Sequence, residues 1–172
     1  MLIQLLNGLV YGGLVYVMAV GLVLIFGLRR VVNFAHGSLF MMGAYIGFSV
    51  AGAFGFWIGL ATSVVVLALL GALLDVAVFR PLQREDPKVT LLVTFGLLLV
   101  LEDLAQTVWG KAFHSLAVPE SLSGTVSLFG EAFPTYRLMV IAVAAAVAFG
   151  LAQWLRSSRI GLFVRASSID PV

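Results

Sequence analysis

The sequence predicts an all-α membrane protein, a polytopic bundle of about five transmembrane helices. Of its 172 residues, 62% are hydrophobic and only 10% are charged, and the mean hydropathy is +1.12. A soluble domain has about 25% charged residues, because its surface must face water. The chain also contains apolar stretches of about 20 residues, the length that a helix needs to cross a bilayer. Lipid is therefore the solvent for most of the chain.

Five stretches qualify as spans, and some are short and rich in glycine. We expect them at residues 3–27, 37–54, 56–79, 89–109 and 137–155. The first is too long for the apolar part of a signal peptide, so we interpret it as a retained helix. The third is apolar until Asp75, and Glu102 and Asp103 interrupt the fourth. Together they predict a bundle over residues 1–155, with an external loop at 110–136.

The positions of lysine and arginine predict the orientation. If every stretch spans, eight of the ten basic residues fall on one side: Arg29, Arg30, Arg80, Arg84, Lys88, Arg156, Arg159 and Arg165. Cytoplasmic loops carry such an excess, so we expect the N-terminus outside and the C-terminus in the cytoplasm. If residues 37–54 were re-entrant, the division would weaken to six against four, so the spanning interpretation has better support.

Small residues recur at a spacing of four, which places them on one face of a helix. Close backbone contact drives helix association in lipid, so this spacing predicts helix packing. The expected packing glycines are Gly8, Gly12, Gly43, Gly47, Gly55 and Gly59. A glycine-lined translocation path is the alternative function of the same residues, and it is compatible with packing.

Few polar side chains lie within the apolar stretches, and they are the candidates for a substrate pathway. Glu102 and Asp103 would each cost about 2.5–3.5 kcal/mol at the bilayer centre, so they need a partner or water. A buried hydrogen bond to another helix would meet the same need. Asn7 lies in the first stretch, and Asn33 and His36 lie where the second begins, with Asn33 a candidate N-cap.

The sequence offers no candidate catalytic residue, metal site or cofactor site. It has no cysteine and only two histidines, His36 and His114, which lie far apart along the chain. A metal site requires three or four convergent ligands. No GxxxxGK[ST] phosphate-binding loop occurs, so the chain is not itself an ATPase.

Three motifs resemble one family, the Liv-type permeases of branched-chain amino acid ABC importers. The most specific is NFAHGSLFMMGAY at residues 33–45, within a longer similar run that begins at Asn7. VFRPLQ at 78–83, followed by VTLLVTFGLLLVLED, resembles the next cytoplasmic turn and helix. RSSRIGLFVRASSIDP at 156–171 resembles the start of the cytoplasmic coupling segment. Members of the family continue beyond this element, so the chain resembles the N-terminal portion of a permease and looks truncated.

The resemblance implies a permease subunit that imports leucine, isoleucine, valine or a similar small amino acid across the bacterial inner membrane. It implies a second permease subunit, two cytoplasmic ATP-binding subunits and an extracytoplasmic solute-binding protein as partners. Contact with an ATPase would fall on Arg159, Gly161, Arg165, Ala166 and Asp170. Arginines at the inner interface that contact only lipid headgroups are the alternative.

Two other functions stay open from the sequence. Import of urea, short amides or another small polar solute is one, because near relatives share the histidine–glycine motif. A non-transport integral-membrane protein, either an enzyme or a scaffold, is the other. An enzyme would require clustered catalytic groups at membrane depth, and the polar residues here are few and scattered.

Overall fold

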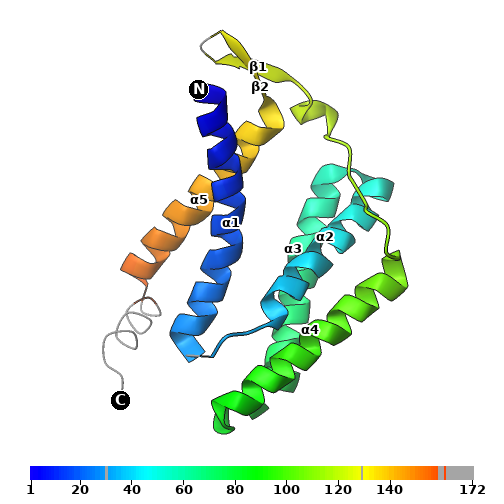
Figure 1. Cartoon of the computed structure of the whole chain (residues 1–172), viewed down its shortest axis with the longest axis vertical. Coiled ribbons are helices and arrows are strands. Elements are labelled where there is room, and N and C mark those ends of the chain that lie inside the picture. The colour runs from blue at the N-terminus through cyan, green and yellow to red at the C-terminus, as the bar shows by residue number, and fades with distance from the viewer. Residues whose placement is uncertain (30, 129, 159–160, 162–172) are drawn as a thin grey trace. The chain divides into compact units, whose positions relative to one another are not determined.

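The structure is a computed structural model that describes residues 1–29, 31–128, 130–158 and 161. It divides into two compact units, each described by itself. Unit 1 comprises Met1–Arg30 and Val118–Val172, and unit 2 comprises Val31–Ala117. In the described residues, five helices are long and apolar enough to cross a membrane (Figure 1). This agrees with the predicted polytopic helical bundle.

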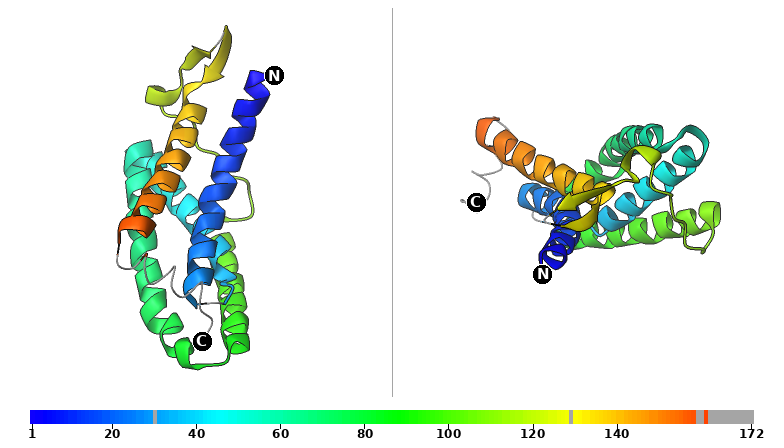
Figure 2. Two further views of the ribbon diagram at one scale, coloured as in Figure 1. Left: turned by 90° about the vertical axis from the view of Figure 1, so that its left-hand side faces the viewer. Right: turned by 90° about the horizontal axis from the view of Figure 1, so that it is seen from above.

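Unit 1 pairs the first and fifth of the long helices in the described residues and joins them to a β-hairpin. Its elements are α1 (Leu2–Arg29), the 3-10 turn η3 (Glu120–Leu122), β1 (Thr125–Leu128), β2 (Glu131–Pro134) and α5 (Thr135–Ser157). The strands are antiparallel, with Val126 opposite Phe133, and β2 leads directly into α5 (Figure 2). Phe133 is fully buried. The loop that the sequence assigns to residues 110–136 thus contains an ordered hairpin.

Helices α1 and α5 run parallel. Near the N-terminus of each, Arg137 Nη1 donates a hydrogen bond to Asn7 Oδ1. Farther along both helices, a Cβ placed on Gly13 would lie 2.9 Å from Ala144 Cβ. The first and fifth spans of an alternating five-span chain must cross in the same direction, and this pairing satisfies that requirement.

Unit 2 contains three long helices, α2 (Ala35–Phe54), α3 (Phe56–Leu74) and α4 (Pro87–Trp109). Phe34, and not Asn33 as the sequence suggests, is the N-cap residue of α2. Asn33 lies one residue earlier, and its Oδ1 accepts a hydrogen bond from Ala35 N at 3.0 Å, as a short polar side chain does in a turn. Asp86 Oδ1 accepts from Lys88 N at 2.8 Å at the start of α4. Gly110, with φ of 79°, ends α4, because a left-handed conformation is open to glycine without steric cost.

Helices α2 and α3 form a tight antiparallel pair that turns at one residue, Gly55, with φ of 89°. In contrast, α2 and α4 run parallel. The rings of Phe34, at the start of α2, and Phe95, in the first half of α4, lie 6.2 Å apart. Trp109 Nε1 donates to Ser49 Oγ at 2.6 Å near the ends of the two helices. The core between these helices consists of Met42, Leu101 and Ala105.

A π-helical turn, η1 (Asp75–Phe79), follows α3, and a 3-10 turn, η2 (Pro81–Arg84), follows it. Arg80 N donates to Asp75 O at 2.8 Å, and the same two residues form an ion pair at 3.0 Å. The wider turn therefore brings residues five apart into contact. The sequence predicts a helix to residue 79, and the apolar segment does end there, but in a π-turn instead of an α-helix.

Candidate functional site

An aromatic cluster lies in unit 2 where the end of α4 meets the second half of α2. Tyr45 and Trp109 stack with their ring centroids 5.1 Å apart. The loop after α4 returns to α2, where the ring of His114 lies 4.9 Å from that of Phe48 and 6.0 Å from that of Tyr45. These ring contacts hold the end of α4 and the loop after it against α2.

The hydrogen bond from Trp109 to Ser49 ties the end of α4 to α2. Trp109→Phe and Ser49→Ala should each lower the free energy of unfolding by about 1 kcal/mol, the net contribution of one hydrogen bond. The double variant should cost less than the sum of the two, because both changes remove the same bond. Thermal unfolding of the four purified proteins checks this. Additive losses would mean that the bond does not hold the two helices together.

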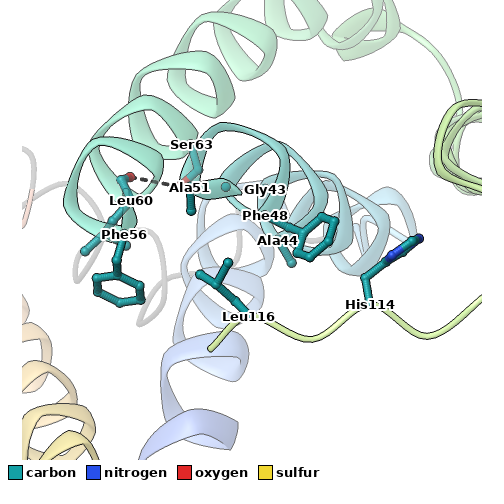
Figure 3. A pocket seen from close by; sticks show the side chains of 10 residues that line it. Gly43, Ala44, Phe48, Ala51, Phe56, Leu60, Ser63, His114 and Leu116 are labelled. Carbon is teal, nitrogen blue, oxygen red and sulfur yellow. Dashed lines mark hydrogen bonds between the residues drawn. The ribbon is translucent and has the colours of Figure 1, made fainter. Parts of the chain in front are cut away.

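An open cavity lies beside this cluster, between α2, α3 and the loop after α4. Its volume is about 270 Å³. The lining residues (Figure 3) are Gly43, Ala44, Gly47, Phe48, Ala51, Phe56, Leu60, Ser63, His114 and Leu116. Gly43 and Gly47 of this lining are among the glycines that the sequence suggests for packing or for a translocation path, but His114 and Ser63 are isolated polar residues about 50 positions apart, and no sequence signal joins them to these glycines. Only the return of the loop onto α2 brings them to one surface.

The predicted pathway residues fall into both units. Asn7 belongs to unit 1, where Arg137 occupies its side-chain oxygen. Asn33 and His36 lie at the start of α2 in unit 2, and Asn33 is buried with its Oδ1 bonded to Ala35 N. Asn7 and Asn33 thus have structural partners. Sequence reasoning missed the contact between Asn7 and Arg137, which joins residues 130 positions apart.

Glu102 and Asp103 lie on an exposed face of α4. Gln106 Nε2 donates to Glu102 Oε1 at a long 3.5 Å. Asp103 and Thr107 line a shallow surface hollow. The opposite face of α4 carries Leu101 and Ala105, which are buried. The two carboxylates therefore point away from the core of unit 2.

The predicted packing glycines have different surroundings. A Cβ on Gly59 would lie 2.7 Å from Gly47 O and 2.8 Å from Ala51 N, so α2 and α3 approach to backbone contact there. Gly43 faces Leu67 across the same interface. In contrast, no described atom lies within 4 Å of a Cβ on Gly8, Gly12 or Gly55. In α1 the residue that contacts α5 is Gly13. The four-residue spacing of glycines instead selects Gly8 and Gly12, which lie on a different face of the helix.

Most of the predicted coupling segment lies outside the described residues. This applies to Arg159, Arg165, Ala166 and Asp170. Gly161 is described, and its N–H donates to Ser158 Oγ at 2.9 Å. Among the described histidines, aspartates and glutamates, no three converge as metal ligands.

Comparison with known proteins identifies the family. The sequence profile of a family described as "Branched-chain amino acid transport system / permease component" matches residues 4–172. This is a transport family and not a family of enzymes. No solved structure matches the chain significantly.

Curated relatives match almost the whole chain. The high-affinity branched-chain amino acid transport system permease protein BraD of Pseudomonas aeruginosa is 28% identical, over 97% of this chain and 59% of its own length. The corresponding protein LivH is 24% identical in Escherichia coli strain K12 and 23% identical in Salmonella typhimurium strain LT2. Both LivH matches cover 97% of this chain and 58% of the relative.

This chain therefore spans less than two thirds of the length of these relatives. The profile match over residues 4–172 and the five apolar helices agree in indicating a multi-pass membrane protein. The chain belongs to the family of permease components of branched-chain amino acid transport systems.

Proposed function

We propose that the chain is part of a membrane-spanning permease subunit of an ABC importer that moves branched-chain amino acids across the bacterial inner membrane. The profile match over residues 4–172 carries this proposal. The proposed partners are a second permease subunit, two cytoplasmic ATP-binding subunits and an extracytoplasmic solute-binding protein. The family and the names of its relatives, which describe permease proteins of transport systems, support these partners.

In the proposed orientation, the N-terminus is outside and the C-terminus is cytoplasmic. The excess of arginine and lysine on one side of the spans supports it. Further support comes from the second helix. At 1.5 Å per residue, the 20 residues of α2 extend about 30 Å, the thickness of a bilayer core. Because α3 returns antiparallel from Gly55 with 19 residues, both helices of this pair are long enough to span.

Cysteine labelling tests the orientation, because the chain contains no native cysteine. Ser123→Cys, before the hairpin, should react with a membrane-impermeant maleimide added to intact cells. Ser157→Cys, at the end of α5, should react only after the membrane is opened. Both serines are exposed in the structure. Reaction of Ser157→Cys from outside would overturn the orientation and, with it, contact between this end of the chain and a cytoplasmic ATPase.

We assign the polar residues of the spans to the pathway with unequal support. Placing the exposed carboxylates of Glu102 and Asp103 against lipid acyl chains would cost free energy. This supports contact of both side chains with water or with a polar partner. Asn7 and Asn33 already have partners within the chain, so they can shape the pathway by fixing helix ends. His36 stays a candidate at the start of α2.

The ATPase contact is proposed for the segment that begins at Arg156. Arg165 would meet an acidic surface of the ATPase, and apolar neighbours such as Phe163 would fill a groove, as amphipathic segments do. Closure of the ATPases on ATP would then tilt the attached helices and alternate access. The role of Arg159, Gly161, Ala166 and Asp170 is to form this same contact.

Uptake by the reconstituted complex tests the function. Proteoliposomes with ATP inside and the binding protein outside should accumulate radiolabelled leucine. Excess isoleucine or valine should compete, whereas excess urea or acetamide should not. Accumulation of urea with no uptake of leucine would replace this proposal by the polar-solute alternative. Failure to assemble with any ATPase would favour a protein that is not a transporter.

Glu102→Gln should lower leucine uptake by about tenfold if the carboxylate lines the pathway, because this loses a charge-assisted hydrogen bond worth about 1.5–3 kcal/mol. The substitution keeps the size of the side chain and one acceptor oxygen but removes the charge, so the effect reports on the carboxylate. Glu85→Gln, an exposed acid in the turn between α3 and α4, is the matched control and should transport normally. Unchanged uptake by the Glu102 variant would remove this residue from the pathway.

A further inference from the structure

The cavity beside α2 and α3 has the size and lining of a small-molecule site. Its volume of about 270 Å³ lies just below the range of about 300–1,000 Å³ for drug-sized ligands, so it suits a smaller ligand. All of its lining lies in unit 2. The lining runs from the middle of α2 through the first two turns of α3, so the cavity lies toward the Gly55 end of the unit, which is the outer end in the orientation proposed above.

The wall of the cavity is mostly apolar. Small residues of α2 form one side, namely Gly43, Ala44, Gly47 and Ala51. Because these residues have little or no side chain, a ligand can approach the helix backbone closely. Phe48, Phe56, Leu60 and Leu116 supply the larger apolar surfaces (Figure 3). A compact aliphatic group fits this lining.

Two polar side chains line the cavity, and both use their donors on the protein itself. Ser63 Oγ donates to Leu60 O at 2.8 Å. His114 Nε2 lies 2.9 Å from Trp109 O, and because a carbonyl oxygen only accepts, Nε2 must carry the hydrogen. In a neutral imidazole, Nδ1 is then an acceptor. The lining, all of it in described residues, therefore offers acceptors on Ser63 and His114 and includes no carboxylate, lysine or arginine.

A lining of this kind discriminates between ligand groups. An ammonium group has three N–H donors and no acceptor, so it matches free acceptors. A carboxylate has acceptors only, and it would find the two side-chain donors already committed. The site thus favours a ligand with a compact aliphatic body and an ammonium group over one with a carboxylate alone.

We propose that this cavity binds the aliphatic side chain and the ammonium group of the solute amino acid on its way into the permease. The inference rests on the proposed import function and adds to it a site and the groups that recognise the solute there. His114 contributes to the site in two ways. It supplies a hydrogen-bond acceptor for the ammonium group. Its ring contacts with Phe48 and Tyr45 also hold the loop that closes one side of the cavity.

Protection of an introduced cysteine tests the site in the full chain within its complex. Ala44→Cys adds a thiol to the cavity wall and leaves both acceptors in place. Gly52→Cys, on the same helix but not in the cavity lining, is the matched control. An impermeant maleimide from the outer side should label Ala44→Cys. Leucine and 3-methylbutylamine, which is leucine without its carboxylate, should each slow this labelling about tenfold when nine sites in ten are occupied.

Each of the following results would overturn the proposal. One is equal protection by 4-methylpentanoate, which is leucine without its ammonium group. Another is equal protection of Gly52→Cys. The third is protection that changes with the acyl chains of the vesicle and not with added leucine, since lipid would then be the occupant. If Ala44→Cys is not labelled from outside, the cavity is not open to the solute, and the proposal fails as well.

His114→Phe keeps an aromatic ring against Phe48 and removes the nitrogen acceptor. The leucine concentration for half-protection should rise about tenfold or more. Phe113→Leu, an exposed neighbour in the same loop and outside this cavity lining, should leave it unchanged. An unchanged value for His114→Phe would exclude His114 from recognition.

Leucine uptake in the same vesicles separates this inference from the function on which it rests. Normal uptake without protection would reject the cavity and leave the importer assignment intact. Absence of uptake of any branched-chain amino acid by the unsubstituted complex would reject the function itself.

Discussion

Gly59→Ala will force α2 and α3 apart and lower the free energy of unfolding by about 1–3 kcal/mol, as overpacking does in a tight interface. The added Cβ would lie 2.7 Å from Gly47 O and 2.8 Å from Ala51 N. Both are backbone atoms, so no side-chain rotation relieves the contact. The thermal unfolding midpoint and the yield of monodisperse protein in detergent should both fall.

Gly71→Ala is the control, because Gly71 belongs to the same helix and no described atom lies within 4 Å of the position of its Cβ. The added methyl should raise helix propensity slightly and leave the interface intact. Equal unfolding midpoints for the two variants would show that the close approach at Gly59 contributes nothing to stability.

Phe133→Ala will destabilise the hairpin of unit 1 by about 3–5 kcal/mol, the cost of truncating a buried phenylalanine. Phe133 is 1% exposed, and it is the largest fully buried side chain among the described residues. Because β2 leads directly into α5, the loss should also loosen the start of that helix. Limited proteolysis from the outer side should cut this variant between α4 and α5 far faster than the parent protein.

Val126→Ala provides the comparison, since Val126 is the cross-strand partner of Phe133 and is 40% exposed. It should change the proteolysis rate little. Similar rates for both variants would mean that burial of Phe133 does not hold the hairpin in place.

Hydropathy predicts the spans well, because the bilayer imposes one requirement, a long apolar helix, on each of them. The predicted fourth span ends at Trp109, as α4 does. Its start, predicted at Val89, lies two residues inside the observed one, because Asp86 and Pro87 add a capped first turn. These features are local, so a sequence can indicate them.

Contacts between distant residues are not predictable in this way. Glycine spacing indicates that α1 has a small-residue face, but not that Gly13 rather than Gly12 meets α5, because the choice depends on how α5 is rotated. The partners of Asn7 and Ser49 lie 130 and 60 positions away. The cavity requires a loop to return to a helix that the chain left some 60 residues earlier.

The single-residue turn at Gly55 has a consequence for membrane insertion. Among the five apolar helices of the described chain, α2 is the least hydrophobic and α3 is one of the two most hydrophobic. Because the chain reverses within one residue, α2 and α3 should reach the lipid at nearly the same time. The strong partition of α3 can thus carry α2 into the bilayer, so biogenesis of this region should proceed by insertion of a helical hairpin and not helix by helix.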